Sequence, residues 1–377
     1  MTTPPMRETR PGLVLMTTDT VGGVWHYSLE LARGLALHGV RVALATMGQP
    51  ISAAQRLEAG RVPGLSLHPS AWKLEWMPDA WGDVDGAGPW LLELENTLRP
   101  DVIHLNGYVH GALSWSAPSL VVGHACVLSW WEAVRRESAP AEWSLYRQRV
   151  REGLRETQLV VAPTQAMLGS LETWYGTLRH GRVIPNSREA AHFPPAPTRQ
   201  PFIFAAGRLG DEGKNIATLG EAAAGLRWPV FVAGARADSS GRTPLPSNVT
   251  SCGNLAPEGV AQWMAAAGIY CLPARYEPFG LSILEAGLAG RALVLGDIPS
   301  LRETWEGVAL FAPPDDAMAL RCALQHLILD PDLRRAYAAA ARERALLFTP
   351  ERTTRAYLEA YRELLLTPDR IAEEEAA

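Results

Sequence analysis

The sequence predicts an α/β protein in which two doubly wound parallel sheets form two domains. The chain has 377 residues, 47% of them hydrophobic, which is long for one domain and sufficient for two cores. Residues 13–46 alternate between an apolar run, a helical pattern and a second apolar run, as parallel sheets do. The alternation starts again at residue 202, after a proline-rich stretch at 194–201 that marks a linker.

The first domain is expected to open with a strand, a turn and a helix. Leu13–Thr18 is an apolar strand, and the turn after it ends in Gly22 and Gly23. Apolar residues then recur at helical spacing as far as Gly39, and residues 40–46 form the next strand. The Gly-x-Gly-x-x-Gly fingerprint is absent, so this turn is not a dinucleotide-binding one.

Residues 48–100 show no clear periodicity, and four tryptophans stand there among prolines and glycines, at positions 72, 76, 81 and 90. We expect a long irregular segment that is functional or mobile. Its aromatic rings either bind a sugar or an apolar group, or only pin the segment to the domain. Asp83-Val-Asp85 is similar to a metal-binding Asp-x-Asp, but no strand precedes it, and we interpret it as a turn.

Polar residues stand at the ends of two further strands of this domain. The strand 101–105 is followed by Asn106, and the strand 120–124 ends at His124. The carboxyl ends of strands in open α/β sheets are where ligands bind, so His124 is a candidate site residue. A packed core histidine is the alternative. The arginine-rich stretch 132–153 is interpreted as a helical region with a solvated face, and a membrane-surface patch is the alternative.

The second domain is expected to place two cations after its first strand, 202–208. Arg208 ends this strand, and Lys214 follows in a glycine-containing loop. Two cations near a helix N-terminus can clamp a diphosphate, and exposed loop side chains are the alternative. Three helical stretches close the chain, and further strands are expected at residues 230–234, 249–253 and 291–296.

The stretch 275–285 carries the strongest chemical pattern in the chain. It follows the apolar strand 268–273 and leads into a helix. Gly280 lets the backbone approach a ligand, and the free N–H groups of the first helical turn attract an anion. Glu277 and Glu285 would repel that anion, so we expect them to accept hydrogen bonds from sugar hydroxyls. Glutamates placed by the helix dipole and on a solvated face are the alternative.

Glu277 and Glu285, with seven residues between them and Pro-Phe-Gly-Leu after the first, resemble the signature of the retaining glycosyltransferases of family four. The resemblance covers nearly the whole chain and is weakest at 48–100. It implies the GT-B fold, in which two Rossmann-like doubly wound domains face each other across a cleft. The implied bounds are 1–190 for an acceptor-binding domain, 191–201 for a linker, 202–348 for a nucleotide-sugar-binding domain, 349–366 for a terminal helix that crosses back to the first domain, and 367–377 for a flexible tail.

The resemblance also implies roles for residues of the first domain. Gly22 and Gly23 resemble the glycine loop where acceptor and donor phosphate approach the first helix, with a plain βα turn as the alternative. His124 resembles the active-site histidine that faces the donor sugar. The segment Pro185-Asn186-Ser187-Arg188 departs from the family pattern, which has Gly after Pro-Asn and then an acidic residue. The lost glycine puts the usual close approach to the ligand in doubt.

In the second domain, Arg208 and Lys214 match the family's cation pair for the diphosphate. Glu277 is implied to hold hydroxyls of the donor sugar, and Glu285 those of the ribose. The positions implied to bind the rest of the donor are Asn254 and Leu255 at the base, and Phe279, Gly280 and Leu281 at the phosphates.

The reaction implied by the resemblance is transfer of a sugar from a nucleotide-diphosphate sugar, UDP- or GDP-linked, to an acceptor hydroxyl with retention of configuration. The acceptor is open between a sugar and a lipid-linked molecule. Protein cations would do the work of a metal, so we expect neither a metal nor another cofactor. The alternatives are a GT-B nucleotide-sugar epimerase or hydrolase and a non-catalytic nucleotide-sugar binding protein.

The composition argues against some classes of binding partner and favours one cellular compartment. The net charge of −5 argues against a nucleic-acid-binding protein. The four cysteines form no Cys-x-x-Cys, which favours thiols in a reducing cytoplasm. Residues 1–10 lack the apolar core of a signal peptide, and no apolar run reaches the roughly 18 residues of a membrane span. We therefore expect a cytoplasmic protein, with peripheral membrane contact as an open alternative.

Overall fold

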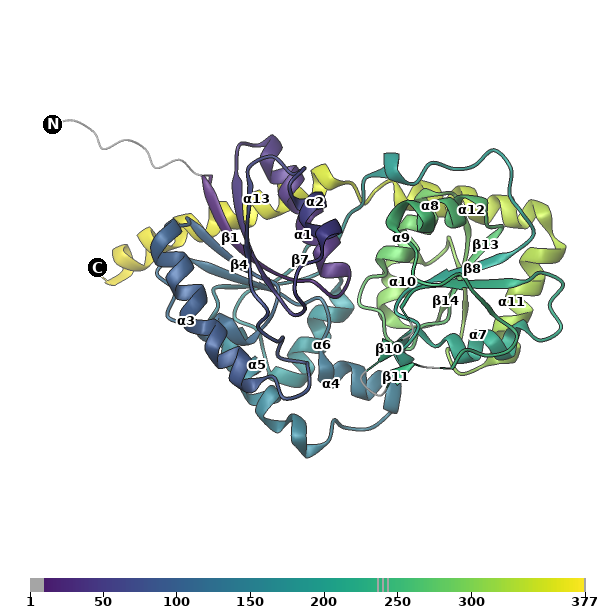
Figure 1. The fold of residues 1–377 in the computed structure, drawn as a ribbon, viewed down its shortest axis with the longest axis horizontal. Coiled ribbons are helices and arrows are strands. Elements are labelled where there is room, and N and C mark those ends of the chain that lie inside the picture. Colours follow the sequence, from purple (N-terminus) through teal and green to yellow (C-terminus); the bar gives the residue numbers. More distant parts are fainter. Residues whose placement is uncertain (1–9, 236, 239–240, 243, 376–377) are drawn as a thin grey trace.

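The computed structural model describes residues 10–235, 237–238, 241–242 and 244–375, which form two α/β lobes (Figure 1). Residues 1–9 of the expected first domain and residues 376–377 of the expected tail lie outside the described residues. Each lobe contains a parallel sheet between layers of helices. The expected fold class, two Rossmann-like doubly wound domains, is therefore confirmed.

The first sheet has the spatial order β3-β2-β1-β4-β5-β6-β7, and every neighbouring pair is parallel. The order reverses between β1 and β4, which makes this the switch point where open sheets bind ligands. Along the chain the strands are β1 (Leu13–Asp19), β2 (Arg41–Met47), β3 (Leu65–Pro69), β4 (Val102–Leu105), β5 (Ser119–Val122), β6 (Leu159–Ala162) and β7 (Gly181–Val183).

Helices cover both faces of this sheet and enclose two apolar cores. Trp25, Leu29 and Ala32, which recur at helical spacing, are all buried against one face. The helices are α1 (Gly23–Leu37), α2 (Ala53–Ala59), α3 (Trp81–Leu98), η1 (Val109–Ala112), α4 (Val127–Trp130), η2 (Trp131–Arg135), η3 (Ala141–Trp143), α5 (Ser144–Glu156), α6 (Gln165–Tyr175) and η4 (Ala190–His192).

The second sheet has the spatial order β12-β9-β8-β13-β14-β15, is also parallel, and has its switch point between β8 and β13. Its strands are β8 (Ile203–Ala206), β9 (Val230–Ala233), β12 (Thr250–Ser251), β13 (Ile269–Leu272), β14 (Ala292–Gly296) and β15 (Leu310–Ala312), and a small hairpin is formed by β10 (Ala237–Asp238) and β11 (Gly241–Arg242). Its helices are η5 (Glu212–Lys214), α7 (Ile216–Ala223), α8 (Pro257–Ala266), α9 (Leu281–Leu288), α10 (Pro299–Trp305), α11 (Ala317–Leu329) and α12 (Pro331–Ala345).

The last helix, α13 (Pro350–Glu375), leaves the second domain and packs on the first. Tyr357 and Tyr361 are fully buried in the same core as Trp25 and Leu29 of α1. In Figure 1 this helix runs in yellow along the back of the first lobe. The first domain is therefore completed by the end of the chain.

Two segments differ from the sequence-based expectation. Residues 48–100 are not a long irregular segment, because they contain α2, β3 and α3. Gly86 lies inside α3, where an added Cβ would come within 2.8 Å of the Trp72 ring, so this glycine serves packing. Trp72 and Trp90 pack around the small core of Met47, Leu74 and Ala87. Gly86 and Trp90 are thus parts of a packed helix, and Trp72 packs against that helix from the preceding segment.

Asp83-Val-Asp85 is likewise not a turn, because it lies at the start of α3. Asp85 forms an ion pair with Arg149 of α5 at 2.7 Å. The basic stretch 132–153 is helical, as expected, but in three pieces. Arg136 takes a left-handed backbone conformation, with φ of 56°, and separates η2 from η3 and α5.

Candidate active site

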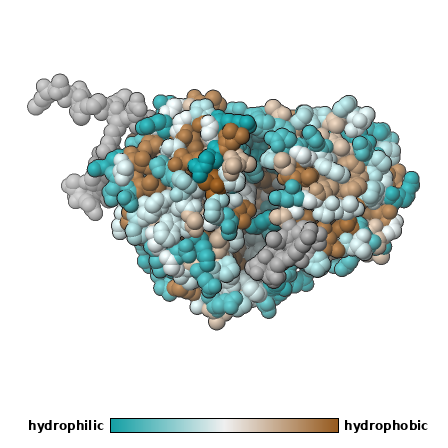
Figure 2. All heavy atoms as spheres, viewed as in Figure 1, coloured by the Kyte–Doolittle hydropathy of each residue, from teal (hydrophilic) through white to brown (hydrophobic). Residues whose placement is uncertain are grey.

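The candidate site lies where the carboxyl ends of the two sheets face each other. In the first domain Gly22 and Gly23 follow β1, and His124 follows β5. In the second domain Arg208 follows β8 and Glu277 follows β13. β1, β8 and β13 stand at the two switch points, where ligands bind in open α/β sheets. Figure 2 shows that the surface is hollowed between the two lobes.

The domains contact each other beside this hollow through backbone and side-chain hydrogen bonds. Thr164 donates to the backbone oxygen of Pro278 over 2.9 Å. The backbone N–H of Cys126 donates to the hydroxyl of Tyr276 over 2.8 Å. The carboxylate of Glu303 on α10 accepts from the first two backbone N–H groups of α6, at 2.7 and 2.9 Å. The loop that carries Glu277 is therefore held against the first domain.

Gly280 shapes the start of α9. Its φ is +88°, and an added Cβ would lie 2.7 Å from Ile283, so any side chain here is strained. No side chain caps α9 before Leu281, so N–H groups of its first turn remain available to a ligand. The Phe279 ring is instead buried against Phe348, with 5.6 Å between ring centroids. Phe279 can therefore meet a ligand only through its backbone.

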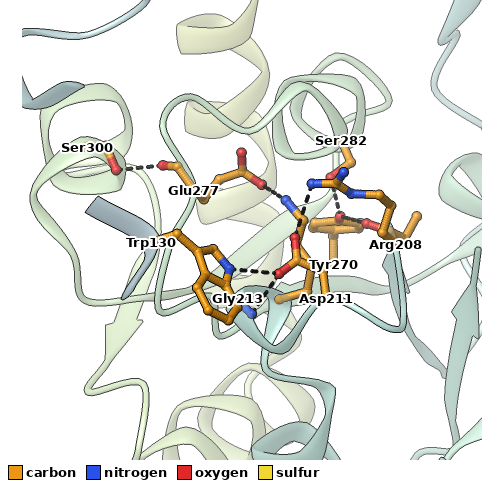
Figure 3. Close-up of polar contacts among 10 residues, drawn as sticks. Trp130, Arg208, Asp211, Gly213, Tyr270, Glu277, Ser282 and Ser300 are labelled. Atoms are coloured by element: carbon orange, nitrogen blue, oxygen red, sulfur yellow. Dashed lines mark hydrogen bonds and ion pairs between the residues drawn. The ribbon is translucent and has the colours of Figure 1, made fainter. Parts of the chain in front are cut away.

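Glu277 is paired with a cation and anchored by its backbone. Nζ of Lys214 lies 2.5 Å from Oε2 of Glu277, and the hydroxyl of Ser300 donates to the backbone oxygen of Glu277 over 2.6 Å (Figure 3). The residue is 9% exposed. Among the described residues nothing hydrogen-bonds to the other carboxylate oxygen, Oε1. This oxygen is thus free for a ligand, while Lys214 offsets the charge.

Arg208 is held more loosely. Its guanidinium lies 3.2 Å from Oδ2 of Asp211, and its side chain is 53% exposed. Oδ1 of Asp211 accepts from the indole of Trp130 at 3.1 Å and from the backbone of Gly213 at 2.9 Å (Figure 3). Because Trp130 comes from the first domain, Asp211 links the two domains beside the cation.

Tyr270 joins the two switch-point loops of the second domain. Its buried hydroxyl lies 2.8 Å from Ser282 in the first turn of α9 and 3.1 Å from the backbone oxygen of Ala206 at the end of β8 (Figure 3). Burial raises the pKa of Tyr270, so the hydroxyl stays protonated. These contacts fix the strand end before Arg208 relative to the start of α9.

His124 is held by two neighbours. Its Nε2 lies 2.8 Å from Oδ1 of Asn106, which follows β4. The ring of Tyr27 packs edge-on against it, with 4.6 Å between ring centroids. Burial lowers the pKa of His124 to about 3, so the imidazole is neutral at ordinary pH.

The glycine loop after β1 faces α9 across the domain boundary. A Cβ added to Gly23 would lie 3.3 Å from Leu281. Asp19 shapes the loop, since its Oδ1 accepts the N–H groups of Val21 and Gly22, both at 3.1 Å. Burial raises the pKa of Asp19, while those two hydrogen bonds and the charge of Arg208 act in the opposite direction. The loop therefore approaches the cation of the second domain.

Glu285 forms an ion pair with Arg188, a residue for which no role in the site is predicted from the sequence. Nη2 and Nε of Arg188 lie 2.6 and 2.7 Å from Oε1 of Glu285. Both side chains are 12% exposed. The third guanidinium nitrogen of Arg188, Nη1, lies 3.7 Å from Glu30 on α1, whose carboxyl pKa is raised by burial. The carboxylate of Glu285 therefore already has a cation beside it.

Asn254 and Leu255 occupy the loop between β12 and α8. The side chain of Asn254 is exposed, while Leu255 packs against the core of the second domain. They stand at the carboxyl end of an edge strand, and among the described residues neither forms a hydrogen bond or ion pair with Glu277 or Arg208. Their role at the base remains a prediction.

Among the described residues, no group of three or more histidine, cysteine, aspartate or glutamate side chains could hold a metal ion. In the same part of the chain, we find no helix with the length and apolar character needed to span a bilayer.

No role in the site is predicted from the sequence for several residues that shape it: Asp19, Asn106, Trp130, Arg188 and Asp211. The position of Asn106 after a strand is the same signal that pointed to His124. Arg188 was noticed only as a departure from a family pattern. Nothing local marks Trp130 or Asp211, since their contact joins residues 81 apart in the chain.

Two family models match the chain in succession. Residues 21–190 match the model for Glycosyltransferase Family 4, and residues 187–344 match the model for Glycosyl transferases group 1. A phosphatidyl-myo-inositol mannosyltransferase from Mycolicibacterium smegmatis is 30% identical over 178 residues, which are 43% of this chain and 46% of that protein. A D-inositol 3-phosphate glycosyltransferase from Saccharomonospora viridis is 35% identical over 103 residues, 26% of this chain and 24% of that protein. The chain thus spans less than half the length of these curated relatives.

Solved structures share the fold over nearly the whole chain. A sucrose-phosphate synthase from Thermosynechococcus elongatus has a TM-score of 0.79 at 20% identity, covering 94% of this chain and 99% of that one. HepE from Anabaena, solved in complex with UDP-glucose, has a TM-score of 0.72 at 18% identity, with 92% and 98% covered. Since the two family models follow one another across residues 21–344 and the fold agrees, the chain belongs to the GT-B glycosyltransferases of group 1.

Proposed function

We propose that this protein is a retaining glycosyltransferase that moves a sugar from a nucleotide-diphosphate sugar to an acceptor hydroxyl without a metal. One observation carries the proposal. The Glu277–Lys214 pair, at 2.5 Å, lies directly before the uncapped start of α9, with the exposed guanidinium of Arg208 on the neighbouring strand end. This arrangement combines an acceptor for sugar hydroxyls with donors for a diphosphate.

The barrier to the reaction comes from charge separation, because the anomeric carbon becomes cationic while the diphosphate leaves. Arg208, Lys214 and the free N–H groups at the start of α9 would stabilise the leaving group. Each such contact supplies about 2–4 kcal/mol when single donors are removed from other enzymes. Fixed protein cations can thus replace a metal at the diphosphate.

Glu277 would bind hydroxyls of the donor sugar through its free oxygen, Oε1. Its charge lies near a ring that becomes positive, so the carboxylate stabilises the transition state more than the ground state. Lys214 prevents that carboxylate from repelling the diphosphate before reaction. The pair would therefore act on both the sugar and the diphosphate of the donor.

We propose retention because the Glu277–Glu285 signature resembles that of the retaining glycosyltransferases; the carboxyls of the described residues bear only on the route. A double-displacement mechanism places two carboxyl groups about 5 Å apart around the bond. Asp19, the carboxylate at the end of β1, is occupied with two backbone N–H groups of its own loop. Attack from the same face, with the leaving phosphate as base, is the route we propose.

The donor is proposed to be UDP- or GDP-linked, and the acceptor a sugar or a lipid-linked alcohol. Support for a UDP-linked donor comes from HepE, which shares the fold and is solved with UDP and with UDP-glucose. Support for a lipid-linked acceptor comes from the relative named as a phosphatidyl-myo-inositol mannosyltransferase. We place the enzyme in the cytoplasm, at most in peripheral contact with a membrane, and the free thiols of all four cysteines fit a reducing compartment.

The test is turnover of UDP-glucose, UDP-galactose, UDP-N-acetylglucosamine and GDP-mannose against inositol, hexose and polyprenol-linked acceptors. We expect one donor to yield a new glycoside with the anomeric configuration of the donor, observed by proton NMR. An inverted product would refute retention. Nucleotide release that does not depend on an acceptor would indicate an epimerase or hydrolase. Binding of a nucleotide sugar without turnover against any acceptor would indicate a binding protein.

A further inference from the structure

Asn106 has a hydrogen-bonding pattern that permits one orientation only. Its Nδ2 donates to the backbone oxygen of Thr17 over 2.7 Å, and its backbone N–H donates to Oγ1 of Thr17 over 2.8 Å. A backbone oxygen can only accept, so the amide nitrogen must face Thr17 and Oδ1 must face His124. Oδ1 also can only accept. Nε2 of His124, at 2.8 Å, therefore carries the proton.

The other ring nitrogen of His124 is then a free acceptor. A neutral imidazole with its proton on Nε2 has an unprotonated Nδ1. Burial keeps the ring neutral, since it lowers the pKa of His124 to about 3. Among the residues that the structure describes, none hydrogen-bonds to Nδ1. The edge-on ring of Tyr27, 4.6 Å away, opposes rotation of the imidazole.

The backbone of the first domain fixes this arrangement. Thr17 lies on β1 and Asn106 directly follows β4, which pair in parallel at the switch point of the sheet. Nδ2 of Asn106 also lies 3.5 Å from Ser28 on α1, which in turn donates to Thr18 over 2.9 Å. The orientation of Asn106 is therefore set by three elements that pack before any ligand binds.

We propose that Asn106 is a positioning residue that holds the proton of His124 on Nε2, so that the Nδ1 lone pair accepts a hydrogen bond from a hydroxyl of the bound donor sugar. His124 then binds the sugar as a neutral acceptor and supplies no proton. The identity of the hydroxyl rests on the proposed function, whereas the protonation of His124 by itself does not.

The protonation is tested by NMR on protein labelled with ¹⁵N-histidine and free of ligand. We expect one slowly exchanging imidazole N–H signal from Nε2 of His124, identified by its absence in His124→Gln. Asn106→Leu should lose this signal. Tyr361→Phe, which removes only the 2.7 Å contact to the neighbouring His104, should retain the signal. A proton on Nδ1 in the wild type, or an unchanged signal in Asn106→Leu, would overturn the proposal.

The link to the sugar is tested by binding of UDP-glucose and GDP-mannose, each compared with its free nucleoside diphosphate. For the nucleotide sugar that binds, Asn106→Leu should weaken affinity about tenfold, the effect of roughly one hydrogen bond. Affinity for the free diphosphate should not change. An equal loss for both ligands would show a merely structural role. Failure of the wild type to bind any of these ligands would refute the proposed function, while the NMR result would still decide the protonation.

Discussion

Glu277 precedes α9 and Glu285 lies within it, and each is paired with a cation, but the two cations belong to different parts of the molecule. Lys214, the partner of Glu277, comes from the same domain. Arg188, the partner of Glu285, comes from the segment between the two sheets and lies 3.7 Å from Glu30 on α1 of the first domain. The first pair is therefore complete within one domain, whereas the second depends on how the domains are placed.

One sequence signature can therefore combine an ion pair that lies within one domain with an ion pair that depends on the placement of both domains. The Glu277–Lys214 pair would keep its geometry if the domains moved apart, as suits a group that acts on the reacting sugar. The Glu285–Arg188 pair would break or turn, so we expect binding at Glu285 to depend on domain closure. Both side chains of that pair are 12% exposed, so removing either partner leaves a charge that is poorly solvated.

The largest effect is expected from Glu277→Gln, which keeps the shape of the side chain and removes its charge. We expect kcat to fall about a thousandfold with little change in the donor KM, because the charge acts mainly in the transition state. Donor-dependent kinetics at saturating acceptor measure this. Glu343→Gln, an exposed change on α12, is the matched control. A variant with full kcat would remove Glu277 from the reacting centre.

The next effect concerns the cations at the diphosphate. Arg208→Ala and Lys214→Ala should each lower kcat about a hundredfold, as expected for the loss of one donor to the leaving group. The Lys214 variant should lose more, because it also leaves Glu277 without its partner. Arg61→Ala, on an exposed arginine, serves as the control. If the double variant keeps the wild-type rate, the diphosphate lies elsewhere.

A smaller effect with a different kinetic pattern is expected at Glu285. Because the ribose changes little during the reaction, Glu285→Gln should raise the donor KM about tenfold and leave kcat nearly unchanged. Arg188→Ala should also raise the donor KM and lower the free energy of unfolding by about 3 kcal/mol. The two changes should not add when combined, since the residues are in contact. The same kinetic pattern at Glu277 and Glu285 would contradict a difference in role between the two glutamates.

The smallest effect is expected from metal removal. EDTA should leave turnover unchanged, since cations of the protein are proposed to balance the diphosphate. Initial rates with and without the chelator measure this. A strong loss that manganese or magnesium restores would contradict a metal-independent reaction and would call for a new donor geometry around Arg208 and Lys214.

The start of α9 is the part of the site that could best be predicted from the sequence. Gly280 requires a left-handed backbone, and the apolar runs on either side predict a strand and a helix, so the loop geometry follows from neighbours in the chain. The secondary structure of the segment 48–100 could not be predicted in this way. Gly86 and Pro89 are usual loop residues, but Gly86 faces the ring of Trp72 inside α3, and only the tertiary packing shows this.

The sequence by itself determined the parallel α/β architecture, the family, and the strand ends that carry Glu277, His124 and Arg208, because strand and helix patterns depend on short-range periodicity. Only the tertiary structure decided which residue each of these side chains contacts by a hydrogen bond or an ion pair. Arg188 and Glu285 are 97 residues apart, and Asn106 reaches both Thr17 and His124 only because three strands stand in one register. The physical reason is that a hydrogen bond or ion pair is specific at about 3 Å, a precision set by packing between elements that are distant in the chain.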